Sequence, residues 1–508
     1  MMQDEYIDRI LGARVYDVAR ETPLEVAESL SRRLDNHVWL KREDLQPVFS
    51  FKLRGAYNKI SGMSPAQLGQ GVICASAGNH GQGVALAARC KGLRAVIVMP
   101  ATTPSIKVQA IQALGGETIS HGQTYDDAYQ HALELAQQQE LAFIHPFDDP
   151  DIIAGQGTVG MEILRQAAQP LDAIFVPVGG GGLAAGVATY VKHLHPDTRV
   201  IGVEPLDAAS MHAALEAGMP VTLDHVGIFA DGVSVRRVGD ETFRLCQKHL
   251  DEVILVSTDE ICAAIKDIFS DTRSISEPAG ALALAGLKRY LELKPASGMH
   301  LAAIVTGANM NFDRLGHVAE RANIGEHTEA LFAVEIPEAP GSFLHFCETL
   351  GRRVVTEFNY RYGDNRQARI FVGIQLQRGD KERREVLEHL LASGFSTLDL
   401  SDNELAKLHV RHMVGGYGPS LADEHLFRFE FPERPGALMS FLQAIGSRWN
   451  ISLFHYRNHG SDFGRVLAGV QVPADDWEDF GQHLSELGYA YWEETSNPAY
   501  QMFLGPTP

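Results

Sequence analysis

The C-terminal third of the chain contains an internal repeat. The run VEIPEAPGSF at residues 334–343 recurs as FEFPERPGAL at residues 429–438, a displacement of 95 positions (429 minus 334). Later matches keep nearly that offset: Tyr360-Arg361 with Tyr456-Arg457, and Gly373-Ile374-Gln375 with Gly469-Val470-Gln471. Repetition of one supersecondary unit constrains a fold more than any single motif does. We therefore predict two similar α+β modules in tandem.

Each copy of the repeat is predicted to form a strand, a Pro-Gly turn, a helix, two strands, a second helix and a last strand, and has the size of a ferredoxin-like unit. We place the first module at residues 330–415 and the second at residues 424–508, beyond a change of sequence texture near Ile324.

Upstream of the repeat, residues 38–315 alternate short β-rich apolar runs with helix-like stretches, which is the pattern of βαβ units. The runs at 173–176, 200–203 and 302–305 are almost continuously apolar, as expected of parallel strands that helices cover on both faces. Residues 1–324 are therefore predicted to form an α/β domain with parallel sheets.

Charge and composition narrow the classes of partner. The chain has 64 acidic and 44 basic residues and a formal net charge of -20, which opposes binding to nucleic acid and to anionic membranes. It contains no apolar run of the roughly 20 residues that a membrane span needs, and no signal peptide at its start. The five scattered cysteines form no Cys-x-x-Cys pair, so no metal site is predicted. We expect a cytoplasmic protein without nucleic-acid or membrane partners.

The run SFKLRGAY at residues 50–57 is typical of a helix start, with Ser50 as the N-cap and Lys52 in the first turn. A cation in this position opposes the helix dipole by about 0.3–1 kcal/mol, so the site favours a neutral amine or an imine over an ammonium. This suits a Schiff-base lysine, although a solvated lysine at a helix edge is the simpler interpretation of this feature alone.

Two loops follow predicted strands and precede helices. In the loop from Ser76 to Gly83, amides and small polar side chains at a helix start could bind a carboxylate, although a tight turn alone would also use glycines. The glycines from Gly179 to Gly182 place unencumbered amides where a phosphate could bind. No Gly-Lys-Ser/Thr sequence follows, which excludes a P-loop. Gly180, Gly182 and Ala185, with Glu204 further along, also mimic a dinucleotide fingerprint, which is a weak match.

Two further positions lie at predicted element boundaries. Thr306 follows the run at 302–305 and places a neutral hydroxyl at the carboxyl edge of a parallel sheet, where ligands of such folds bind. Glu277 precedes Pro278 and marks a helix start. Its carboxylate could act locally or favour the helix dipole, and we take the dipole interpretation as the simpler one.

In this order, the motifs at Lys52, Ser76–Gly83, Gly179–Leu183 and Thr306–Asn309 resemble those of fold-type II (tryptophan synthase β-like) pyridoxal-phosphate enzymes of the serine/threonine dehydratase group. The duplicated tail is similar to the two ACT-like regulatory modules of the long, biosynthetic threonine deaminases (threonine ammonia-lyases). The resemblance covers essentially the whole chain. It implies β-elimination of L-threonine, and more weakly of L-serine, to 2-oxobutanoate and ammonia, as the first committed step of isoleucine biosynthesis.

The resemblance also assigns roles to single residues. Lys52 would form the Schiff base with pyridoxal 5'-phosphate and move the substrate proton, and Ser76 would bind the substrate carboxylate. Phe51 would pack against the cofactor ring, Asn79 would bind its phenolic oxygen, and Thr306 would face its pyridine nitrogen. Family members often have serine or cysteine at this last position. The cofactor phosphate would be held by the backbone amides of Gly179, Gly180, Gly181, Gly182 and Leu183.

For the modules, the resemblance implies feedback inhibition by isoleucine, with valine as a candidate antagonist, and a homotetramer. We expect the isoleucine site at the turn after Pro340-Gly341, with Phe343 and Tyr360 as its side chains; by the duplication, Tyr456 is the counterpart of Tyr360. The alternative is that these aromatic residues only pack in the module cores.

Two other functions compete with this interpretation. Serine dehydratase, serine racemase and threonine synthase share the lysine and the glycine loop, but the duplicated tail argues against them. A non-catalytic amino-acid sensor would use the tandem modules, but the intact lysine, loop and glycine motifs argue against a decayed enzyme.

Overall fold

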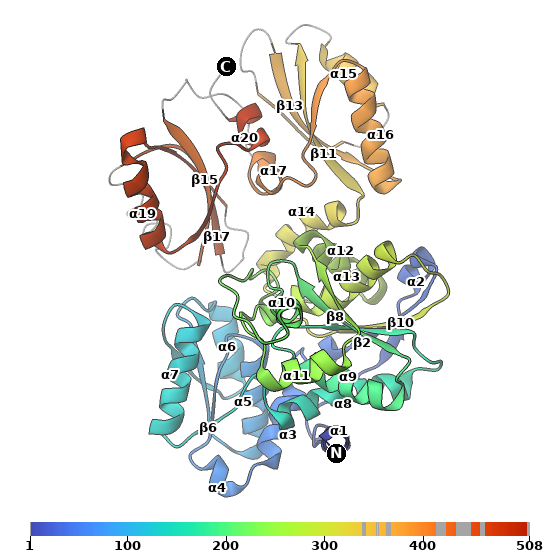
Figure 1. The fold of residues 1–508 in the computed structure, drawn as a ribbon, viewed down its shortest axis with the longest axis vertical. Coiled ribbons are helices and arrows are strands. Elements are labelled where there is room, and N and C mark those ends of the chain that lie inside the picture. The colour runs from blue at the N-terminus through green and yellow to red at the C-terminus, as the bar shows by residue number, and fades with distance from the viewer. Residues whose placement is uncertain are drawn as a thin grey trace. The chain divides into compact units, whose positions relative to one another are not determined.

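The chain divides into two compact units, Met1–Phe312 and Asp313–Pro508 (Figure 1). The computed structural model describes residues 2–337, 342–351, 353, 355–361, 367–412, 423–432, 449–457 and 463–504. The texture change predicted near Ile324 lies in helix α14 (Leu315–Gly325), which groups with the second unit. Among the described residues, no helix is both long and apolar enough to cross a membrane.

The first unit contains a six-stranded sheet in the order β1-β2-β10-β7-β8-β9. Strand β1 pairs antiparallel with β2, and the remaining neighbours pair in parallel. The apolar runs predicted as buried strands are three of its members, β7, β8 and β10. The bounds are β1 Leu24–Val26, β2 His37–Arg42, β7 Ala173–Pro177, β8 Arg199–Pro205, β9 Glu252–Val256 and β10 His300–Val305.

A second, four-stranded sheet in the same unit is parallel throughout, in the order β5-β4-β3-β6. The two sheets, which are parallel except for the edge strand β1, and the helices between their strands confirm the predicted α/β domain. The strand bounds are β3 Val72–Ala75, β4 Ala95–Met99, β5 Glu117–Ser120 and β6 Ala142–Phe143.

Helices connect these strands. Those that border the region discussed below are α3 (Lys52–Gly62), α5 (Asn79–Lys91), α8 (Pro150–Gln166), α9 (Gly182–Leu194) and α13 (Pro278–Leu293). The other α-helices of the unit are α1 Met2–Leu11, α2 Glu28–Leu34, α4 Pro65–Leu68, α6 Ser105–Ala113, α7 Tyr125–Gln138, α10 Ser210–Ala217, α11 Asp240–His249 and α12 Thr258–Thr272.

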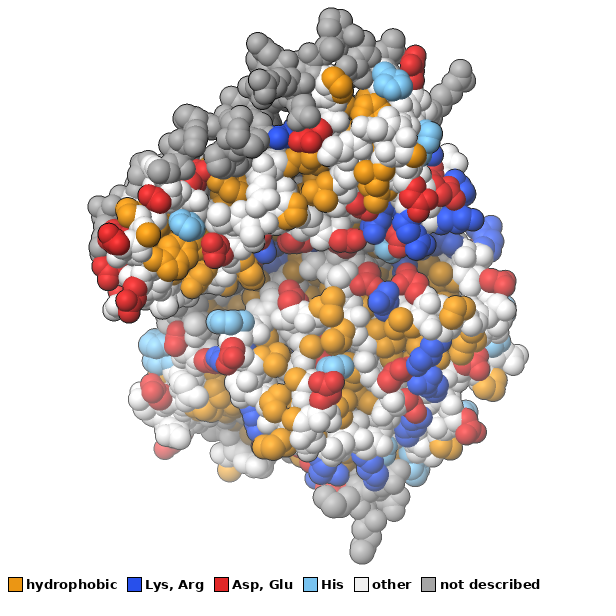
Figure 2. Space-filling model, turned by 45° about the horizontal axis from the view of Figure 1, so that its top comes forward, with side chains coloured by type: hydrophobic (Ala, Val, Ile, Leu, Met, Phe, Trp, Pro, Cys, Tyr) orange, Lys and Arg blue, Asp and Glu red, His pale blue; other side chains and the backbone are white. Residues whose placement is uncertain are grey.

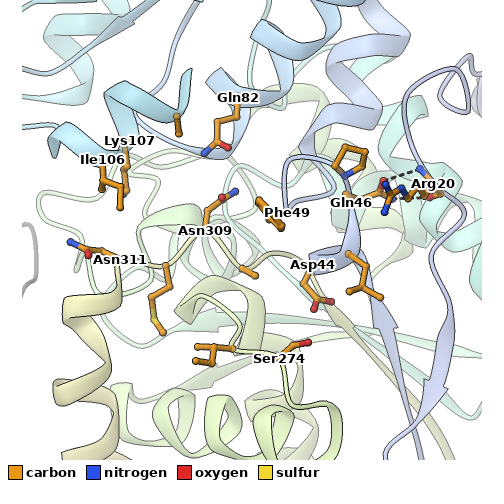
Figure 3. Close-up of a pocket in the computed structure, with 16 residues that line it drawn as sticks. Arg20, Asp44, Gln46, Phe49, Gln82, Ile106, Lys107, Ser274, Asn309 and Asn311 are labelled. Carbon is orange, nitrogen blue, oxygen red and sulfur yellow. Dashed lines mark hydrogen bonds between the residues drawn. The ribbon is translucent and has the colours of Figure 1, made fainter. Parts of the chain in front are cut away.

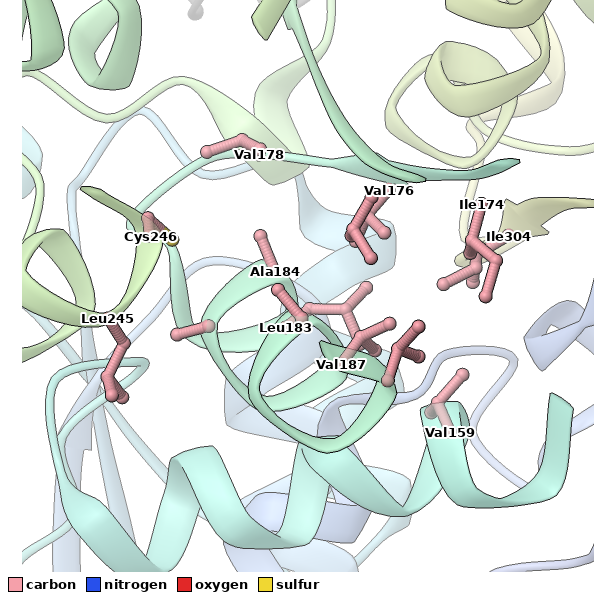
Figure 4. Close-up of a cluster of buried hydrophobic side chains, with 14 of the residues drawn as sticks. Val159, Ile174, Val176, Val178, Leu183, Ala184, Val187, Leu245, Cys246 and Ile304 are labelled. Atoms are coloured by element: carbon pink, nitrogen blue, oxygen red, sulfur yellow. The ribbon is translucent and has the colours of Figure 1, made fainter. Parts of the chain in front are cut away.

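Strand β7 is apolar on both faces because other side chains cover both of them. On one face, Ile174 and Val176 pack in a fully buried cluster with Val187 of α9 (Figure 4). On the other face, the ring of Phe175 meets Tyr290 of α13 edge-on, with 5.5 Å between the ring centroids. Because successive side chains of a strand point to opposite faces, a strand covered on both sides must be apolar at every position.

Helices α8 and α9 approach each other through glycine. A Cβ atom at Gly186 of α9 would lie 2.5 Å from the carbonyl oxygen of Ile153 and 2.7 Å from the amide nitrogen of Gly157. Both contact atoms belong to the backbone of α8, which cannot rotate away as a side chain can. The helix that begins at the glycine loop is thereby held at a fixed distance from α8.

The second unit contains two four-stranded sheets of the same design. Their strand orders are β12-β13-β11-β14 and β16-β17-β15-β18, and all neighbours pair antiparallel. The first sheet consists of β11 Glu329–Pro337, β12 Val355–Arg361, β13 Gln367–Gln375 and β14 Ser396–Asp399, with helices α15 Ser342–Leu350 and α16 Gly379–Ala392. The second consists of β15 Glu424–Pro432, β16 Asn450–Arg457, β17 Phe463–Gln471 and β18 Ala490–Glu493, with helix α19 Trp477–Leu487.

The repeat predicted from the sequence is therefore a structural repeat. Even its irregularities recur, because the register shifts between Val355 and Glu357 in one module and between Ile451 and Leu453 in the other. A shared core joins the two modules and includes residues of the short helices α17 (Glu404–Leu408) and α20 (Pro498–Phe503).

The surface agrees with the mixed composition of the chain. Figure 2 shows acidic and basic side chains interspersed with hydrophobic ones over the described residues of the visible face. Several charged side chains of the second unit are paired, for example Arg378 with Glu385 and Arg383 with Asp402.

Gly186→Ala tests the helix contact. The added methyl group forces α8 and α9 apart, so the free energy of unfolding should fall by about 1–3 kcal/mol. Gly62→Ala is the control, since a Cβ at this exposed position in the last turn of α3 meets no atom within 4 Å. Urea unfolding followed by circular dichroism measures both variants. Equal unfolding midpoints for Gly186→Ala and Gly62→Ala would contradict the contact.

Candidate active site

Helix α3 begins at Lys52, and its start is tied to the end of β10. The amide of Phe51 donates to the carbonyl oxygen of Thr306 at 3.3 Å, and Ser50 forms an isolated antiparallel bridge with Gly307. The N-cap residue of α3 is Phe51. The prediction that Ser50 occupies this position is therefore wrong. Ser50 still serves the helix start, because its Oγ accepts the amide of Lys52 at 3.3 Å.

The amine of Lys52 lies in a largely dry environment. Its Nζ donates to the carbonyl oxygen of Pro146 at 3.2 Å and lies 5.5 Å from the centroid of the Phe51 ring. Burial lowers the pKa of Lys52 to about 8, and the negative charge of Glu277 offsets part of that shift. A lysine with such a pKa is neutral in a useful fraction of molecules near neutral pH, as a nucleophile or a general base requires.

The loop between β3 and α5 is organised by its serine. The Oγ of Ser76 accepts the amide of Gly78 at 3.2 Å and that of Gly81 at 3.0 Å, and the residue is 8% exposed. At the start of α5, Asn79 contacts two residues that lie far away in the sequence. Its Nδ2 donates to Glu277 at 2.5 Å, and its Oδ1 accepts Nδ2 of Asn309 at 2.6 Å.

The glycine loop leaves buried amides at the start of a helix. Residues 180–183 are buried, and their four amides donate no hydrogen bond inside the described part of the chain. Gly181 has φ +95, and a Cβ at Gly180 would lie 2.2 Å from the ring of Phe147. Buried amides at a helix N-terminus bind anions well, since the helix dipole favours negative charge there. The loop therefore fits a phosphate group.

Thr306 lies at the end of β10, as predicted. It is 3% exposed, and its hydroxyl donates to the carbonyl oxygen of Ala279 in the first turn of α13 at 3.1 Å. The strand end, the start of α13 and the start of α3 therefore meet around one buried hydroxyl. The structure thus gathers Lys52, Ser76, Asn79, the glycine loop and Thr306 at ends of strands and starts of helices within the first unit.

The dinucleotide fingerprint suggested by Gly180 and Gly182 is not supported. Glu204 is fully buried, and its two carboxylate oxygens accept the amides of Met211 and His212 at 2.8 Å each. Burial raises the pKa of Glu204 to about 7. A carboxylate already bound to the start of α10 does not serve as the acceptor of ribose hydroxyls that such a fingerprint needs.

Three residues of this region were missed by the sequence interpretation. Asn309 belongs to the Thr306–Asn309 motif, but nothing local indicated its contact with Asn79. Glu277 was taken as a helix-start residue. His80, the neighbour of Asn79, is bonded to the carbonyl oxygen of Ile144 at 2.9 Å, and burial lowers its pKa to about 3.

A cleft of about 690 Å³ is lined by Asn309 together with residues of α5 and α6 (Figure 3). In this view Gln82 of α5 lies on its upper side, Phe49 and Asn309 lie near its middle, and Asp44 and Ser274 lie on its lower side. Phe49 is 56% exposed and has φ +55, a left-handed conformation that is uncommon outside glycine. Asn309 lines the cleft and also donates to Asn79, so it connects the cleft wall to the start of α5.

Two predictions from the sequence concern metal-binding clusters and the side chains expected to bind the effector. The described residues contain no group of three or more His, Cys, Asp or Glu side chains that could hold a metal ion. The backbones of Phe343, Tyr360 and Tyr456 belong to α15, β12 and β16, but their side chains lie outside the described residues, as do Pro340 and Gly341. Tyr360 pairs with Ile370, and Tyr456 pairs with Val466 in the same register.

Two protein-family models match the chain. Residues 15–307 match pyridoxal-phosphate-dependent enzymes. Residues 320–410 and 418–504 each match the C-terminal regulatory domain of threonine dehydratase. The second model thus finds the same duplication that the sequence shows.

Comparison with known proteins gives relatives over nearly the full length. The chain is 57% identical over 507 residues to the biosynthetic L-threonine dehydratase of Burkholderia multivorans, covering 99% of this chain and all of the relative. It is 55% identical to the Escherichia coli enzyme of the same name, covering 98% of this chain and 97% of the relative. Among solved structures, the processed threonine deaminase isoform 2 of Solanum lycopersicum has a TM-score of 0.62 at 52% identity. The structural match covers 63% of this chain and 93% of the Solanum lycopersicum chain.

The environment of Lys52 predicts a pH profile. In the cofactor-free protein, acetylation of Lys52 by acetic anhydride should reach half its maximal rate near pH 8, against about pH 10.4 for a solvated lysine. Burial is the cause, because it destabilises the charged amine. Peptide mass spectrometry over a pH series measures the rate. A midpoint at pH 10 or above would contradict the buried environment.

Proposed function

The chain belongs to the family of pyridoxal-phosphate-dependent, biosynthetic threonine dehydratases, and on this premise we propose that Lys52 binds the cofactor and moves the substrate proton. The protein is accordingly an L-threonine dehydratase (threonine ammonia-lyase) that performs the first step of isoleucine biosynthesis. The observation that carries the proposal is the position of the Lys52 amine, which donates to the carbonyl oxygen of Pro146, the neighbour of the Phe147 ring that packs against Gly180 of the glycine loop.

The residues present fit pyridoxal phosphate. The buried amides of residues 180–183 suit its phosphate, because they have no acceptor within the described chain and lie at the start of α9. The amine of Lys52 suits its aldehyde carbon. When bound, the cofactor supplies an electron sink for the negative charge that develops at the substrate Cα.

Lys52 performs the proton transfer at Cα. A neutral amine is required for this step, and the lowered pKa of Lys52 supplies it at moderately alkaline pH without a further base. Lys52 takes the proton from Cα, and the β-hydroxyl takes up one proton and departs as water. Water then hydrolyses the released enamine, through its imine form, to 2-oxobutanoate and ammonia. L-serine, which lacks one methyl group, fills the same site less completely and reacts more weakly.

The other residues of the site bind the substrate and orient the cofactor. Ser76 and the adjacent amides take the substrate carboxylate, since this loop presents its polar groups at the start of α5. Asn79 would bind the phenolic oxygen of the cofactor, Phe51 would pack against its ring, and Thr306 would face the ring nitrogen. An uncharged hydroxyl at that nitrogen would leave it largely unprotonated and would favour elimination over transamination.

The regulatory domain implies an allosteric effector. We propose that isoleucine, the end product, binds at the turn between β11 and α15, near Phe343 and Tyr360, and that valine opposes it. Coupling of about 1–3 kcal/mol between this site and Lys52 is enough to switch the enzyme between active and inhibited states. The homotetramer and the cytoplasmic location stay predictions.

Replacing Lys52 by alanine tests the catalytic assignment. The variant should lose threonine elimination by several orders of magnitude, because no other group at Cα replaces the amine. Borohydride reduction and peptide mapping should find the cofactor on Lys52 in the wild type and on no peptide of the variant. Lys59→Ala is the matched control, since Lys59 lies on the same helix but pairs with Asp149 and Asp151. A variant that keeps a tenth of the wild-type rate would refute the role of Lys52.

Removal of the second unit tests the modular assignment. A chain that ends at Phe312 should eliminate threonine but no longer respond to isoleucine, because the compact division of the chain falls after this residue. Initial rates with and without isoleucine decide the outcome, with the full chain assayed alongside. Full inhibition of the shortened enzyme would place the effector site in the first unit.

Phe343→Ala and Tyr360→Ala test the position of the isoleucine site. Each should weaken isoleucine inhibition at least tenfold, because each removes apolar contacts to the aliphatic side chain, while turnover without isoleucine stays nearly unchanged. Tyr456→Ala shows whether the second module has an equivalent site. The inhibition curve of each variant is compared with that of the wild type, and coinciding curves would show that Phe343 and Tyr360 serve only the module core.

A further inference from the structure

Glu277 is buried without capping the helix that it precedes. It occupies the N-cap position of α13, but its side chain makes no capping hydrogen bond. Only 3% of the residue is exposed. A buried carboxylate is costly unless other groups bind it, so a residue that only favoured a helix dipole would gain little by this burial.

The carboxylate instead contacts Asn79. Its Oε1 accepts Nδ2 of Asn79 at 2.5 Å, while Oδ1 of Asn79 accepts Nδ2 of Asn309 at 2.6 Å. Asn309 is itself fixed, because the same nitrogen donates to the carbonyl oxygen of Val48 at 2.8 Å. A carboxylate only accepts and an amide nitrogen only donates, so these partners allow one orientation of the Asn79 amide. One N–H of Asn79 is left for a ligand.

Two glycines leave room for the Glu277 carboxylate between the start of α13 and the segment after β10. A Cβ at Gly307 would lie 2.5 Å from Oε1 of Glu277, and a Cβ at Gly280 would lie 2.2 Å from the carbonyl oxygen of Gly307. The amide of Glu277 also donates to that carbonyl oxygen at 3.0 Å. The start of α13 and the segment after β10 therefore pack against each other at backbone distance, and they fix the place of the carboxylate.

The same carboxylate also interacts electrostatically with Lys52. Glu277 raises the pKa of Lys52 against the larger effect of burial, and two histidines also interact with this lysine. Burial lowers the pKa of His80 to about 3 and lowers that of His145 as well, so both are largely neutral where the enzyme works. Glu277 is thus the counter-charge among the groups that interact with Lys52.

We propose that Glu277 is a positioning residue of the active site: it holds the Asn79 amide in one orientation and provides the counter-charge of Lys52. This inference rests on the proposed roles of Lys52 and Asn79. It assigns to Glu277 a function in the reaction, whereas the interpretation preferred from the sequence was that its carboxylate favours the helix dipole, with a local role as the alternative.

The counter-charge is tested in the cofactor-free, full-length protein with Glu277→Gln. Glutamine keeps the shape and an acceptor for Asn79 but removes the charge. The pH midpoint of Lys52 acetylation should fall by roughly half a unit or more, because the ammonium form loses its partner. Ser257→Ala is the control: Ser257 caps α12 in the same unit, so the variant should lower thermal stability and leave the midpoint unchanged. If the pH midpoint of Lys52 acetylation is unchanged in Glu277→Gln, Glu277 is not the counter-charge of Lys52.

The positioning role is tested by adding Glu277→Ala and measuring the affinity for pyridoxal phosphate by absorbance titration of the cofactor-free protein. The alanine variant should bind the cofactor at least tenfold more weakly, whereas Glu277→Gln should bind nearly as the wild type does. Equal affinity in all three proteins overturns the positioning role. If borohydride mapping places the cofactor on another lysine, the proposed role of Lys52 fails, while the acetylation midpoint still reports on Glu277 itself.

Discussion

The position of the catalytic helix depends on one buried ionic network. The guanidinium of Arg54 binds Glu43 at 2.8 Å and Glu162 at 2.6 Å, and all three side chains are fully buried. Lys41 binds Glu162 at 2.6 Å, so the network contains two cations and two anions. Buried charges are tolerated only when each is paired and hydrogen-bonded, and removal of one partner typically costs about 3–5 kcal/mol. Arg54 lies two residues after Lys52, so the network fixes the start of α3 between β2 and α8.

The other residues of the site lie at the carboxyl ends of strands from both sheets of the first unit. The loop with Asn79 follows β3, the glycine loop follows β7, and Thr306 ends β10. Parallel strands carry their ligands at the carboxyl edge, since the helices that follow begin there and present free amides. The rigid contact of α8 with α9 at Gly186 then holds the glycine loop relative to α3, which also packs on α8.

The sequence predicted those features that a local pattern encodes. The apolar runs predicted the parallel strands, the repeat predicted two modules, and the motif order predicted where helices and loops alternate. Contacts between distant residues carry no local signal. Glu277 lies 198 residues from Asn79, and Glu162 lies 108 residues from Arg54, so neither contact could be read from spacing. Glu204 shows the opposite error, because its position in the pattern was right for a ribose acceptor while its carboxylate is used within the protein.

The proton equilibrium at Lys52 follows from two opposed effects with different structural sources. Burial lowers the pKa from its ordinary value to about 8, and it depends on the packing of α3, which the ionic network maintains. The carboxylate of Glu277 limits this lowering, and it depends on the close contact of α13 with Gly307. A general base works best when its pKa lies near the operating pH, since a lower value weakens the base and a higher value leaves it protonated. Because the same carboxylate also orients Asn79, its removal alters base strength and cofactor binding together, whereas loss of its charge alone alters base strength. A change that affects burial alone shifts the pKa and leaves the Asn79 amide in place.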